Sequence, residues 1–386
     1  METSCIETVE FKENQWYRIA SQLLKHADIQ INGQRPWDIQ VKHADFFKRV
    51  LQQGSLGLGE SYMEGWWQCQ CLDQLFYRLL RYQIHQQTPK HNRDLIRVLM
   101  ARLLNQQTRK RALTVGKVHY DLGNDLFSRM LDPYMQYSCG YWHTAETLEQ
   151  AQQDKLSLIC QKLQLKPGMS LLDIGCGWGG LAEYAARHYG VKVYGVTISA
   201  EQQKMASQRC KDLDVTILLQ DYRDLNQQFD RIVSVGMFEH VGPKNYETYF
   251  KVVAHNLKPD GLFLLHTIGA NQTSLQVDPW IEKYIFPNGC LPSIAHIARA
   301  SEHDFVMEDW HNFGADYDKT LMAWFQRFNM IWPTIAKNYD EKFKRMFSYY
   351  LNACAGAFRA RDIQLWQVVF SRGIEGGLHV PHSSVQ

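Results

Sequence analysis

The sequence predicts an α/β fold, in which a mostly parallel sheet is covered by helices on both faces and a smaller helical domain precedes it. From Met169 onward, short apolar runs of strand length alternate with stretches of helix length, and this alternation is typical of parallel βαβ units. Before Met169, apolar residues recur at three- and four-residue spacing, which indicates helices. The chain of 386 residues is longer than most single domains, so we expect a main domain with attachments.

Residues 1–117 are predicted to form the smaller helical domain. Residues 16–25 and 45–53 have helical periodicity, and a glycine-rich stretch at 54–65 is expected to interrupt the helices. Residues 78–117 contain ten Lys or Arg and a single acidic residue, although the net charge of the whole chain is only +2. The positive charge is therefore concentrated in one segment of this domain.

The main domain is expected to span residues 118–386. A loop rich in Tyr, Asp and Gly leads to a helix near residues 147–163, and a Lys-Pro-Gly sequence at 166–168 ends that helix. The expected strands are 170–174, 192–197, 215–220, 229–235, 261–268 and 365–370. The helices expected between them are 180–189, 200–211 and 244–257. Before the last strand we expect a helical insertion rich in aromatic residues, at about 278–362.

A glycine-rich loop follows the first expected strand, where the chain reads Asp-Ile-Gly-Cys-Gly-Trp-Gly-Gly at 173–180. Glycine is needed where the backbone turns sharply and approaches a ligand closely. A G-x-G-x-G sequence preceded by an acidic residue is typical of S-adenosylmethionine enzymes, whereas dinucleotide enzymes use G-x-G-x-x-G. The loop therefore predicts S-adenosylmethionine as the cofactor and a Rossmann-like fold of the class I methyltransferases. A structural glycine turn or a nicotinamide site is the alternative.

The ends of the second and third strands supply further candidates for the cofactor site. The second strand lacks the acidic residue that often binds the ribose in this fold, so Thr197, Ser199 and Gln202 are the candidates for that contact. Ser199 also suits the N-cap of the following helix, and the two roles are compatible. After the third strand, Asp221 is predicted to accept a hydrogen bond from the adenine amine, with a simple turn residue as the alternative.

Three polar side chains follow the fourth and fifth strands. Glu239 and His240 come directly after the fourth strand, and the fifth strand carries His266 to the same edge of the sheet. A single histidine at such a place is more often structural. A carboxylate beside two histidines at one edge indicates a reactive site.

Several motifs together resemble the family of cyclopropane-fatty-acyl-phospholipid synthases, over essentially the whole chain. The motifs are the glycine loop, Tyr-Ser-Cys at 137–139, Val-Thr-Ile-Ser at 196–199, Phe-Glu-His at 238–240, Phe-Pro-Asn-Gly at 286–289 and Tyr-Leu-Asn-Ala-Cys at 350–354. The resemblance implies transfer of a methylene group from S-adenosylmethionine to the cis double bond of unsaturated acyl chains in membrane phospholipids. It implies that the alkene attacks the sulfonium methyl group and that bound bicarbonate deprotonates the resulting carbocation.

The resemblance also implies roles for particular residues. The predicted catalytic positions are Cys139, Glu239, His266, Ile268, Tyr317 and Cys354. For Cys354 we expect a buried thiol rather than a nucleophile, because direct attack by the alkene needs no covalent step. The predicted cofactor contacts are Tyr137, Ser138, Leu171, Leu172, Asp173, Ile174, Gly175, Cys176, Gly177, Trp178, Gly179, Thr197, Ile198, Ser199, Gln202, Gln220, Asp221, Tyr222 and Arg223. The aromatic insertion is the expected place for the acyl chain, and no metal site is expected.

Residues 93–104 mix apolar and basic side chains at helical spacing, as a helix on a membrane surface does. The solvated face of an ordinary core helix is an equal alternative, and nucleic acid is a third, without a recognition motif to accompany it. The resemblance favours a phospholipid bilayer as the partner, and a homodimer is compatible with it. The first residues do not form a secretory signal and no apolar run reaches about 18 residues. We therefore expect a cytoplasmic protein bound peripherally to the inner face of the membrane.

Two other functions remain open on the sequence. The first is a methyltransferase of the same fold that acts on another lipid or a small molecule, and such an enzyme needs no bound base. The second is a peripheral membrane protein that has lost its activity. The intact glycine loop and Glu239 argue against the second.

Overall fold

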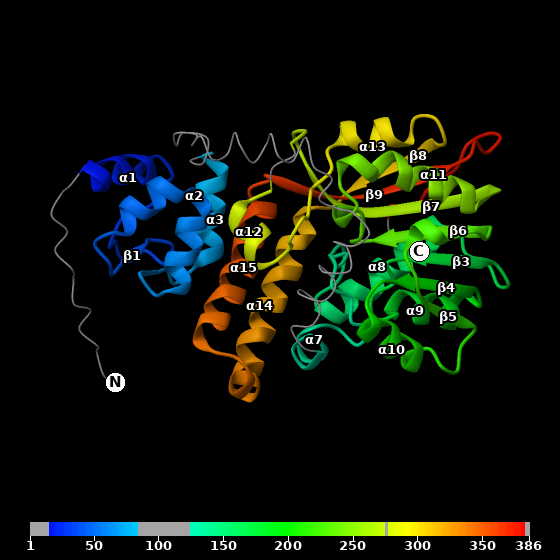
Figure 1. The fold of residues 1–386 in the computed structure, drawn as a ribbon, viewed down its shortest axis with the longest axis horizontal. Coiled ribbons are helices and arrows are strands. Elements are labelled where there is room, and N and C mark those ends of the chain that lie inside the picture. The colour runs from blue at the N-terminus through cyan, green and yellow to red at the C-terminus, as the bar shows by residue number, and fades with distance from the viewer. Residues whose placement is uncertain (1–14, 84–123, 275–276, 383–386) are drawn as a thin grey trace.

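The computed structural model describes residues 15–83, 124–274 and 277–382. A set of helices from the N-terminal part lies beside long helices from the C-terminal part, and a layered sheet lies beyond them (Figure 1). This arrangement confirms the predicted α/β class, with its mostly parallel sheet.

Seven strands form the main sheet in the order β5-β4-β3-β6-β7-β9-β8. The strands from β5 to β7 are parallel, and β9 runs antiparallel to both β7 and β8. Their bounds are β3 Ser170–Ile174, β4 Lys192–Thr197, β5 Val215–Leu219, β6 Phe229–Val235, β7 Leu257–Ala270, β8 Val306–Asn312 and β9 Ile363–Ser371. The chain order reverses between β3 and β6, and the carboxyl ends of strands at such a point are where open α/β sheets bind ligands.

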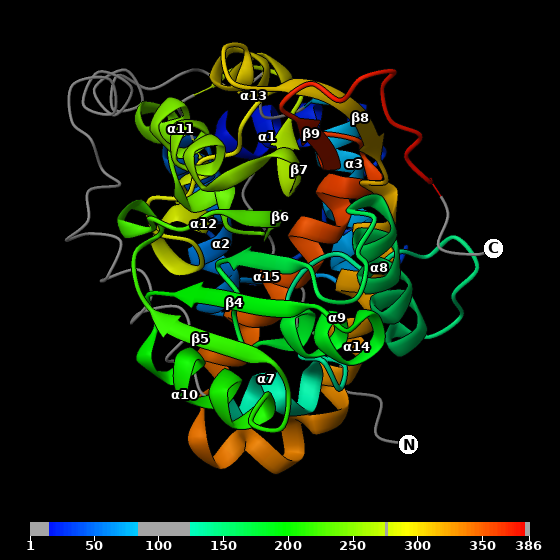
Figure 2. The same ribbon diagram turned by 90° about the vertical axis from the view of Figure 1, so that its right-hand side faces the viewer.

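Helices cover both faces of this sheet. On one face, side chains of α8 (Leu148–Lys162), α9 (Gly180–Tyr189) and α10 (Ala200–Arg209) form a buried cluster with β3 and β4. On the other face, α11 (Tyr246–Asn256) and α13 (Ile294–Ser301) contribute to a second cluster. Figure 2 shows α11 and α13 on one side of the molecule and α9 and α10 on the other. The two clusters explain why the strands are apolar on both faces.

Local signals set the ends of these helices. Thr147 and Gln150 form a capping box at the start of α8, in which each side chain accepts a hydrogen bond from the backbone N–H of the other residue. Gly190 ends α9 in the left-handed conformation, with φ of 63°. The expected helix 180–189 therefore has the predicted bounds.

The N-terminal helices are α1 (Gln15–His26), α2 (Phe46–Met63) and α3 (Leu72–Arg81), and the short strands β1 (Gln40–Val41) and β2 (Trp67–Gln68) pair antiparallel. Part of the predicted interruption at 54–65 is present: the backbone of Gly54 is non-helical, with φ of 59° and ψ of −137°, but the helix then resumes and continues to Met63. A later glycine of α2 serves close packing: a Cβ atom at Gly59 would lie 2.3 Å from the ring of Trp280.

The insertion contains α12 (Pro279–Tyr284), α14 (Ala315–Ile335) and α15 (Glu341–Arg359), but it also contains β8 and α13. The insertion is therefore largely helical, and the strand β8 is the element in it that the sequence did not predict. As an edge strand, β8 has no fully buried residue and lacks the apolar run that identifies the central strands.

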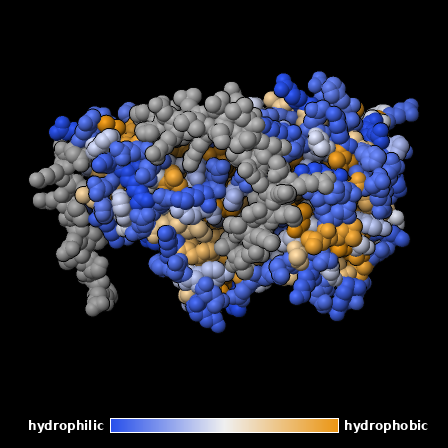
Figure 3. Space-filling view, viewed as in Figure 1, coloured by the Kyte–Doolittle hydropathy of each residue, from blue (hydrophilic) through white to orange (hydrophobic). Residues whose placement is uncertain are grey.

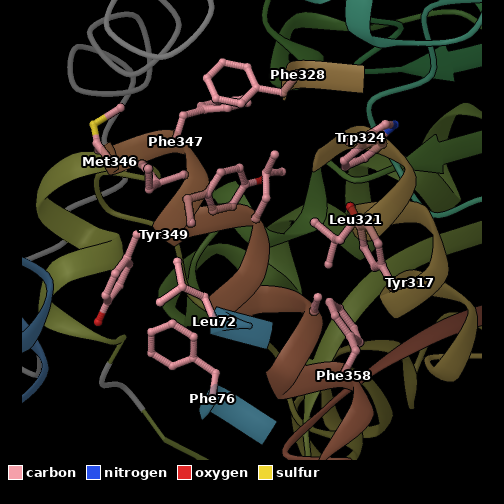
Figure 4. Packing of buried hydrophobic residues seen from close by; sticks show 14 of the residues in the cluster. Leu72, Phe76, Tyr317, Leu321, Trp324, Phe328, Met346, Phe347, Tyr349 and Phe358 are labelled. Carbon is pink, nitrogen blue, oxygen red and sulfur yellow. The ribbon is translucent and has the colours of Figure 1, made fainter. Parts of the chain in front are cut away.

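A hydrophobic core joins the N-terminal helices to the insertion. Leu72 and Phe76 of α3 and Phe347 and Tyr349 of α15 belong to one buried cluster, and the cluster extends to Trp324 of α14 (Figure 4). A domain boundary near residue 117 stays a prediction, because that position lies outside the described residues. The short helix α7 (Asn124–Met130) begins the next described segment.

Within the described ranges, no helix is both long enough and apolar enough to cross a membrane. The face drawn in Figure 3 is mainly hydrophilic, with apolar side chains in separate patches. The predicted basic segment 93–104 lies outside the residues that the structure describes.

Candidate active site

A pocket opens at the carboxyl ends of β3, β4, β5 and β6, beside the point where the strand order reverses. All but three of the predicted cofactor contacts line it. The exceptions are Leu171 and Leu172, whose side chains are buried in the clusters on opposite faces of the sheet, and Gly179, the N-cap of α9. The predicted contacts therefore identify the pocket correctly, but three of them do not line it.

The glycine loop has the backbone conformation that its composition predicts. Gly175 and Gly177 both have positive φ, of 81° and 54°. A Cβ atom at Gly177 would meet no atom within 4 Å, because this glycine faces open space in the pocket wall. The loop thus lets a ligand approach the main chain at this point.

The end of β4 forms a small polar network. The hydroxyl of Thr197 donates to Oε1 of Gln202 at 2.9 Å, and the hydroxyl of Ser199 accepts from the backbone N–H of Gln202 at 3.3 Å. Ser199 is therefore the N-cap of α10, which is one of the two roles predicted for it. All three side chains also line the pocket, so the ribose contact remains open to them.

At the end of β5, Asp221 and Arg223 form a two-point ion pair. Nε of Arg223 donates to Oδ1 of Asp221 at 2.8 Å, and Nη2 donates to Oδ2 at 2.6 Å. Asp221 also caps the short turn that follows. Asp221 therefore has the role of a turn residue, which was the predicted alternative to an adenine contact. Asp221 and Arg223 also line the pocket, together with Gln220 and Tyr222.

Glu239 lies just behind the pocket, in a short turn after β6. Its Oε1 accepts a hydrogen bond from the backbone N–H of Ile268 at 2.7 Å, while the buried Oε2 makes no hydrogen bond to any described residue. Burial raises the pKa of Glu239 to about 7. Near pH 7 this carboxyl group is therefore partly protonated and partly ionised, so it can donate or accept a proton.

His266 lies on β7 and is almost completely buried. Its Nδ1 is 3.3 Å from the amide nitrogen of Gln367 on β9, and its Nε2 makes no hydrogen bond among the described residues. Burial lowers the pKa of His266 well below its ordinary value, and the charges of Lys155 and Lys162 lower it further. The imidazole is therefore neutral near pH 7.

Tyr317 is a further predicted catalytic residue, and it lies close to Glu239. The Tyr317 hydroxyl is close enough to Cys139, Glu239 and Cys354 to interact with each electrostatically, and its pKa is raised well above the ordinary value, mainly by burial. The Cys139 thiol donates to the carbonyl oxygen of Gly140 at 3.1 Å. Tyr317 is thus close to Cys139, Glu239 and Cys354, Glu239 is hydrogen-bonded to Ile268, and none of the six residues predicted to be catalytic lines the pocket.

Cys354 has the character expected of a thiol without nucleophilic function. It lies on α15, and burial raises the pKa of its thiol to about 12. Burial likewise raises the pKa of Cys139 well above its ordinary value. Both side chains are therefore neutral thiols near pH 7, and a thiolate is the form that attacks an electrophile.

Aromatic rings enclose this cluster on the side of the insertion. The ring of Tyr137 lies 5.0 Å from that of Trp324, and its hydroxyl is 3.0 Å from the hydroxyl of Tyr350. The Tyr317 ring packs against Phe358 at 4.6 Å, and Figure 4 shows these two side chains beside Leu321 and Trp324. The site therefore combines polar groups at the sheet edge with an apolar, aromatic wall.

Sequence reasoning missed several residues of the pocket. Gln136, Met237, Pro287 and Asn288 also line it. Gln136 directly precedes the Tyr-Ser-Cys motif, so its neighbours in the sequence were a usable signal. Pro287 and Asn288 belong to a motif that had been noted without a role.

Comparisons with known proteins agree with this geometry. The family model for mycolic acid cyclopropane synthetase matches residues 107–368. The cyclopropane-fatty-acyl-phospholipid synthase of Escherichia coli (strain K12) is 71% identical over 380 residues, which are 98% of this chain and 100% of that protein. A probable fatty acid methyltransferase of Pseudomonas putida is 40% identical over 276 residues, 68% of this chain and 70% of that protein.

A solved structure shares the fold as well. The mycolic acid cyclopropane synthase CmaA1, in a complex with SAH and CTAB, superposes with a TM-score of 0.63 at 33% identity. That alignment covers 67% of this chain and 97% of the other. Because the family model spans most of this chain and a relative matches it almost from end to end, the protein belongs to the mycolic acid cyclopropane synthetase family.

Proposed function

We propose that this protein transfers a methylene group from S-adenosylmethionine to the cis double bond of an unsaturated acyl chain in membrane phospholipid, which forms a cyclopropane ring. The observation that carries this proposal is the likeness to the E. coli synthase over 98% of the chain. The pocket at the sheet edge and the buried polar cluster behind it supply the two sites that this reaction needs.

The pocket fits S-adenosylmethionine. Gly177 faces open space, the end of β4 offers hydroxyl and amide groups, and Tyr222 offers an aromatic face at the end of β5. The related CmaA1 structure is described as a complex with SAH, which supports the same assignment here. When bound, the cofactor supplies an electrophilic methyl carbon on a sulfonium centre.

The walls of the site serve the attack by the alkene. Apolar and aromatic side chains of α14 and α15 exclude water from the acyl chain, and exclusion of water protects a carbocation from capture. The rings of Tyr137 and Tyr317 belong to this aromatic wall and are the proposed partners of the positive charge that develops on the substrate. Such an attraction is worth up to about 2 kcal/mol in a water-excluded site.

Ring closure also requires a base, and we assign the binding of bicarbonate to the cluster of Cys139, Glu239, His266, Ile268 and Tyr317. The fit rests on two buried atoms that make no hydrogen bond among the described residues, Oε2 of Glu239 and Nε2 of His266. Buried polar atoms without partners are rare in proteins, and a small oxyanion would satisfy both. Bicarbonate bound there would supply the base for the proton lost from the transferred carbon.

A methyltransferase that leaves a branched methyl group is the second candidate, and the likeness to the P. putida protein favours it. That reaction uses the same cofactor site. It differs in the fate of the carbocation: the transferred carbon keeps all three hydrogens, and a proton is lost instead from a neighbouring carbon of the acyl chain, which leaves a methyl-branched alkene.

The test uses vesicles of a monounsaturated phospholipid incubated with S-adenosylmethionine and the protein. We expect the acyl chains to gain one methylene group in mass spectra and to lose their vinyl signals in proton NMR. Unchanged lipid, in the presence of protein that binds the cofactor, would contradict the proposal and direct the search to soluble acceptors.

The location and assembly of the protein belong to the same proposal. Peripheral binding to the inner face of the membrane would bring the pocket to its substrate, with the basic segment 93–104 as the contact. A homodimer is part of the proposal as well, and sedimentation equilibrium of the purified protein would test it.

A further inference from the structure

A buried lysine lies directly behind the wall of the pocket. Lys155 belongs to α8, and its side chain is fully inaccessible to solvent. Its Nζ donates to Oε1 of Gln136 at 2.6 Å and to the hydroxyl oxygen of Ser138 at 2.9 Å. Both acceptors line the pocket, so the ammonium group stands one side chain away from a bound ligand.

The charge of Lys155 is only partly balanced within the protein. Asp132, Cys139 and Asp173 are the acidic groups close enough to affect it, yet no carboxylate oxygen lies within salt-bridge distance of Nζ among the described residues. The carboxylate of Asp132 accepts two backbone N–H groups, those of Tyr134 and Gln136, both at 2.8 Å. A buried charge without an ion-pair partner is costly unless a counter-charge arrives.

Asp173 does not supply that counter-charge in full. It is buried, its Oδ2 makes no hydrogen bond to a described residue, and burial raises its pKa to about 7. A substantial fraction of Asp173 is therefore protonated near neutral pH. The site can therefore accept an additional negative charge from an anionic group of the ligand.

The order of the strands fixes which end of S-adenosylmethionine would meet Lys155. The residues at the end of β5 were assigned to the adenine and those at the end of β4 to the ribose. The end of β3 lies beyond β4 in the sheet order, and Gln136 packs against Gly180, directly after the glycine loop that follows β3. The amino-acid part of an extended ligand therefore reaches this side of the pocket, which Gln136 and Ser138 line. Its carboxylate is the negatively charged group of the cofactor.

We propose that Lys155 is a positioning residue for the carboxylate of the amino-acid part of S-adenosylmethionine, and that it acts through Ser138. Because the hydroxyl oxygen of Ser138 accepts a hydrogen bond from Nζ, its own hydrogen is directed elsewhere, toward the pocket that Ser138 lines. The ammonium group strengthens this donor and adds a positive potential in a region of low dielectric constant. The inference rests on the proposed use of S-adenosylmethionine.

Two ligands separate this role from a merely structural one. S-adenosylhomocysteine and 5′-methylthioadenosine share the adenosine and a thioether, but only the first carries the amino acid. The variant Lys155→Met keeps the aliphatic stem and loses the charge and the donors. We expect it to bind S-adenosylhomocysteine at least about tenfold more weakly in calorimetry, and to bind 5′-methylthioadenosine within about twofold of the wild type.

A second variant keeps the test valid if Lys155→Met does not fold. Ser138→Ala removes the hydroxyl through which the lysine is proposed to act, and it should show the same selective loss for S-adenosylhomocysteine. If both single variants fold, the double variant should lose little more than either one, because the two groups form one unit.

The outcomes are distinct. An equal loss of both ligands in Lys155→Met would make the lysine a structural support of the loop, and an unchanged affinity for S-adenosylhomocysteine would remove it from the site. Either result overturns the inference while S-adenosylmethionine remains the cofactor. Failure of the wild-type protein to bind S-adenosylhomocysteine would instead refute the proposed function.

Discussion

Glu239 is a carboxylate at the end of the central strand β6, with one oxygen fixed by the backbone of Ile268 and the other without a partner among the described residues. Its proposed role is to orient the base and not to bind the cofactor. We therefore predict that Glu239→Gln lowers the turnover of phospholipid by at least about a hundredfold. The affinity for S-adenosylhomocysteine, measured by calorimetry, should stay within about twofold of the wild type.

Normal turnover in Glu239→Gln would remove this residue from the mechanism. A matched control is Glu247→Gln on α11, where the carboxylate is exposed and forms an ion pair with Lys251 on the same helix. That variant should retain wild-type turnover.

Burial of Glu239 also makes the stability of the protein depend on pH. Its pKa is about 7 in the folded state, against an ordinary value of 4.5, so between these pH values the folded state keeps a proton that the unfolded state has lost. Ionisation of this group therefore destabilises the fold as the pH rises from 4.5 to 7. Glutamine cannot ionise, so the free energy of unfolding of Glu239→Gln should rise relative to the wild type by up to about 3 kcal/mol over this range.

Urea unfolding of both proteins at pH 5 and pH 7.5 measures this difference. Asp173, whose pKa is also about 7, contributes equally to both proteins and cancels. A difference that does not change with pH would show that Glu239 ionises normally in the fold.

Sequence reasoning predicted the positions of Glu239, His266 and Tyr317 because they stand in motifs at the sheet edge or match the resemblance. It missed Lys155, because a lysine on an amphipathic helix ordinarily reaches solvent. Only the three-dimensional structure shows that the face of α8 that carries it packs on the loop at 136–138.

At the scale of elements, hydrogen bonds and close packing hold α2 and α12 together. The side chains of Lys283 and Tyr284 both donate to Oε1 of Glu60, and Gly59 faces the ring of Trp280. A methyl group at Gly59 would overlap this ring, which is fully buried. We predict that Gly59→Ala lowers the free energy of unfolding by about 1–3 kcal/mol, measured by urea unfolding.

The control for that substitution is Gln52→Ala, at an exposed position of the same helix. It should leave stability within about 0.5 kcal/mol of the wild type. A Gly59→Ala variant as stable as the control would mean that α2 and α12 separate easily.

The bounds of β3, β4 and β6 were predicted to the residue, because strands buried on both faces read as continuous apolar runs. The strand β7 is longer than predicted, 257–270 instead of 261–268. The edge strand β8 and the course of α2 were not predicted. β8 is partly exposed and mixed in composition, and Gly59 of α2 suggests a break unless the ring of Trp280 that packs against it is known. Both errors concern features that depend on tertiary contacts.

At the scale of the whole molecule, the account requires the protein to reach a bilayer. Arg93, Arg97 and Arg102 stand in the basic segment outside the described residues. Each basic side chain near an anionic surface contributes about 1 kcal/mol. We therefore predict that replacing all three with Gln weakens binding to vesicles of anionic phospholipid by about a hundredfold at low salt, measured by co-sedimentation.

Added salt should reduce this difference, since it screens the attraction. A control variant replaces Lys166, Lys204 and Lys211, which are exposed on the sheet domain, with Gln. An equal loss in the control would show that only the total charge matters, and no loss in the arginine variant would place the membrane contact elsewhere.

The most direct test of the central claim follows the hydrogens of the transferred carbon. The protein would be incubated with S-adenosylmethionine carrying a fully deuterated methyl group and with vesicles of monounsaturated phospholipid, and the acyl chains examined by mass spectrometry. The account predicts that each added carbon keeps two deuterium atoms, because a base removes the third as the ring closes. A product that keeps all three would contradict it and would identify the protein as a methyltransferase.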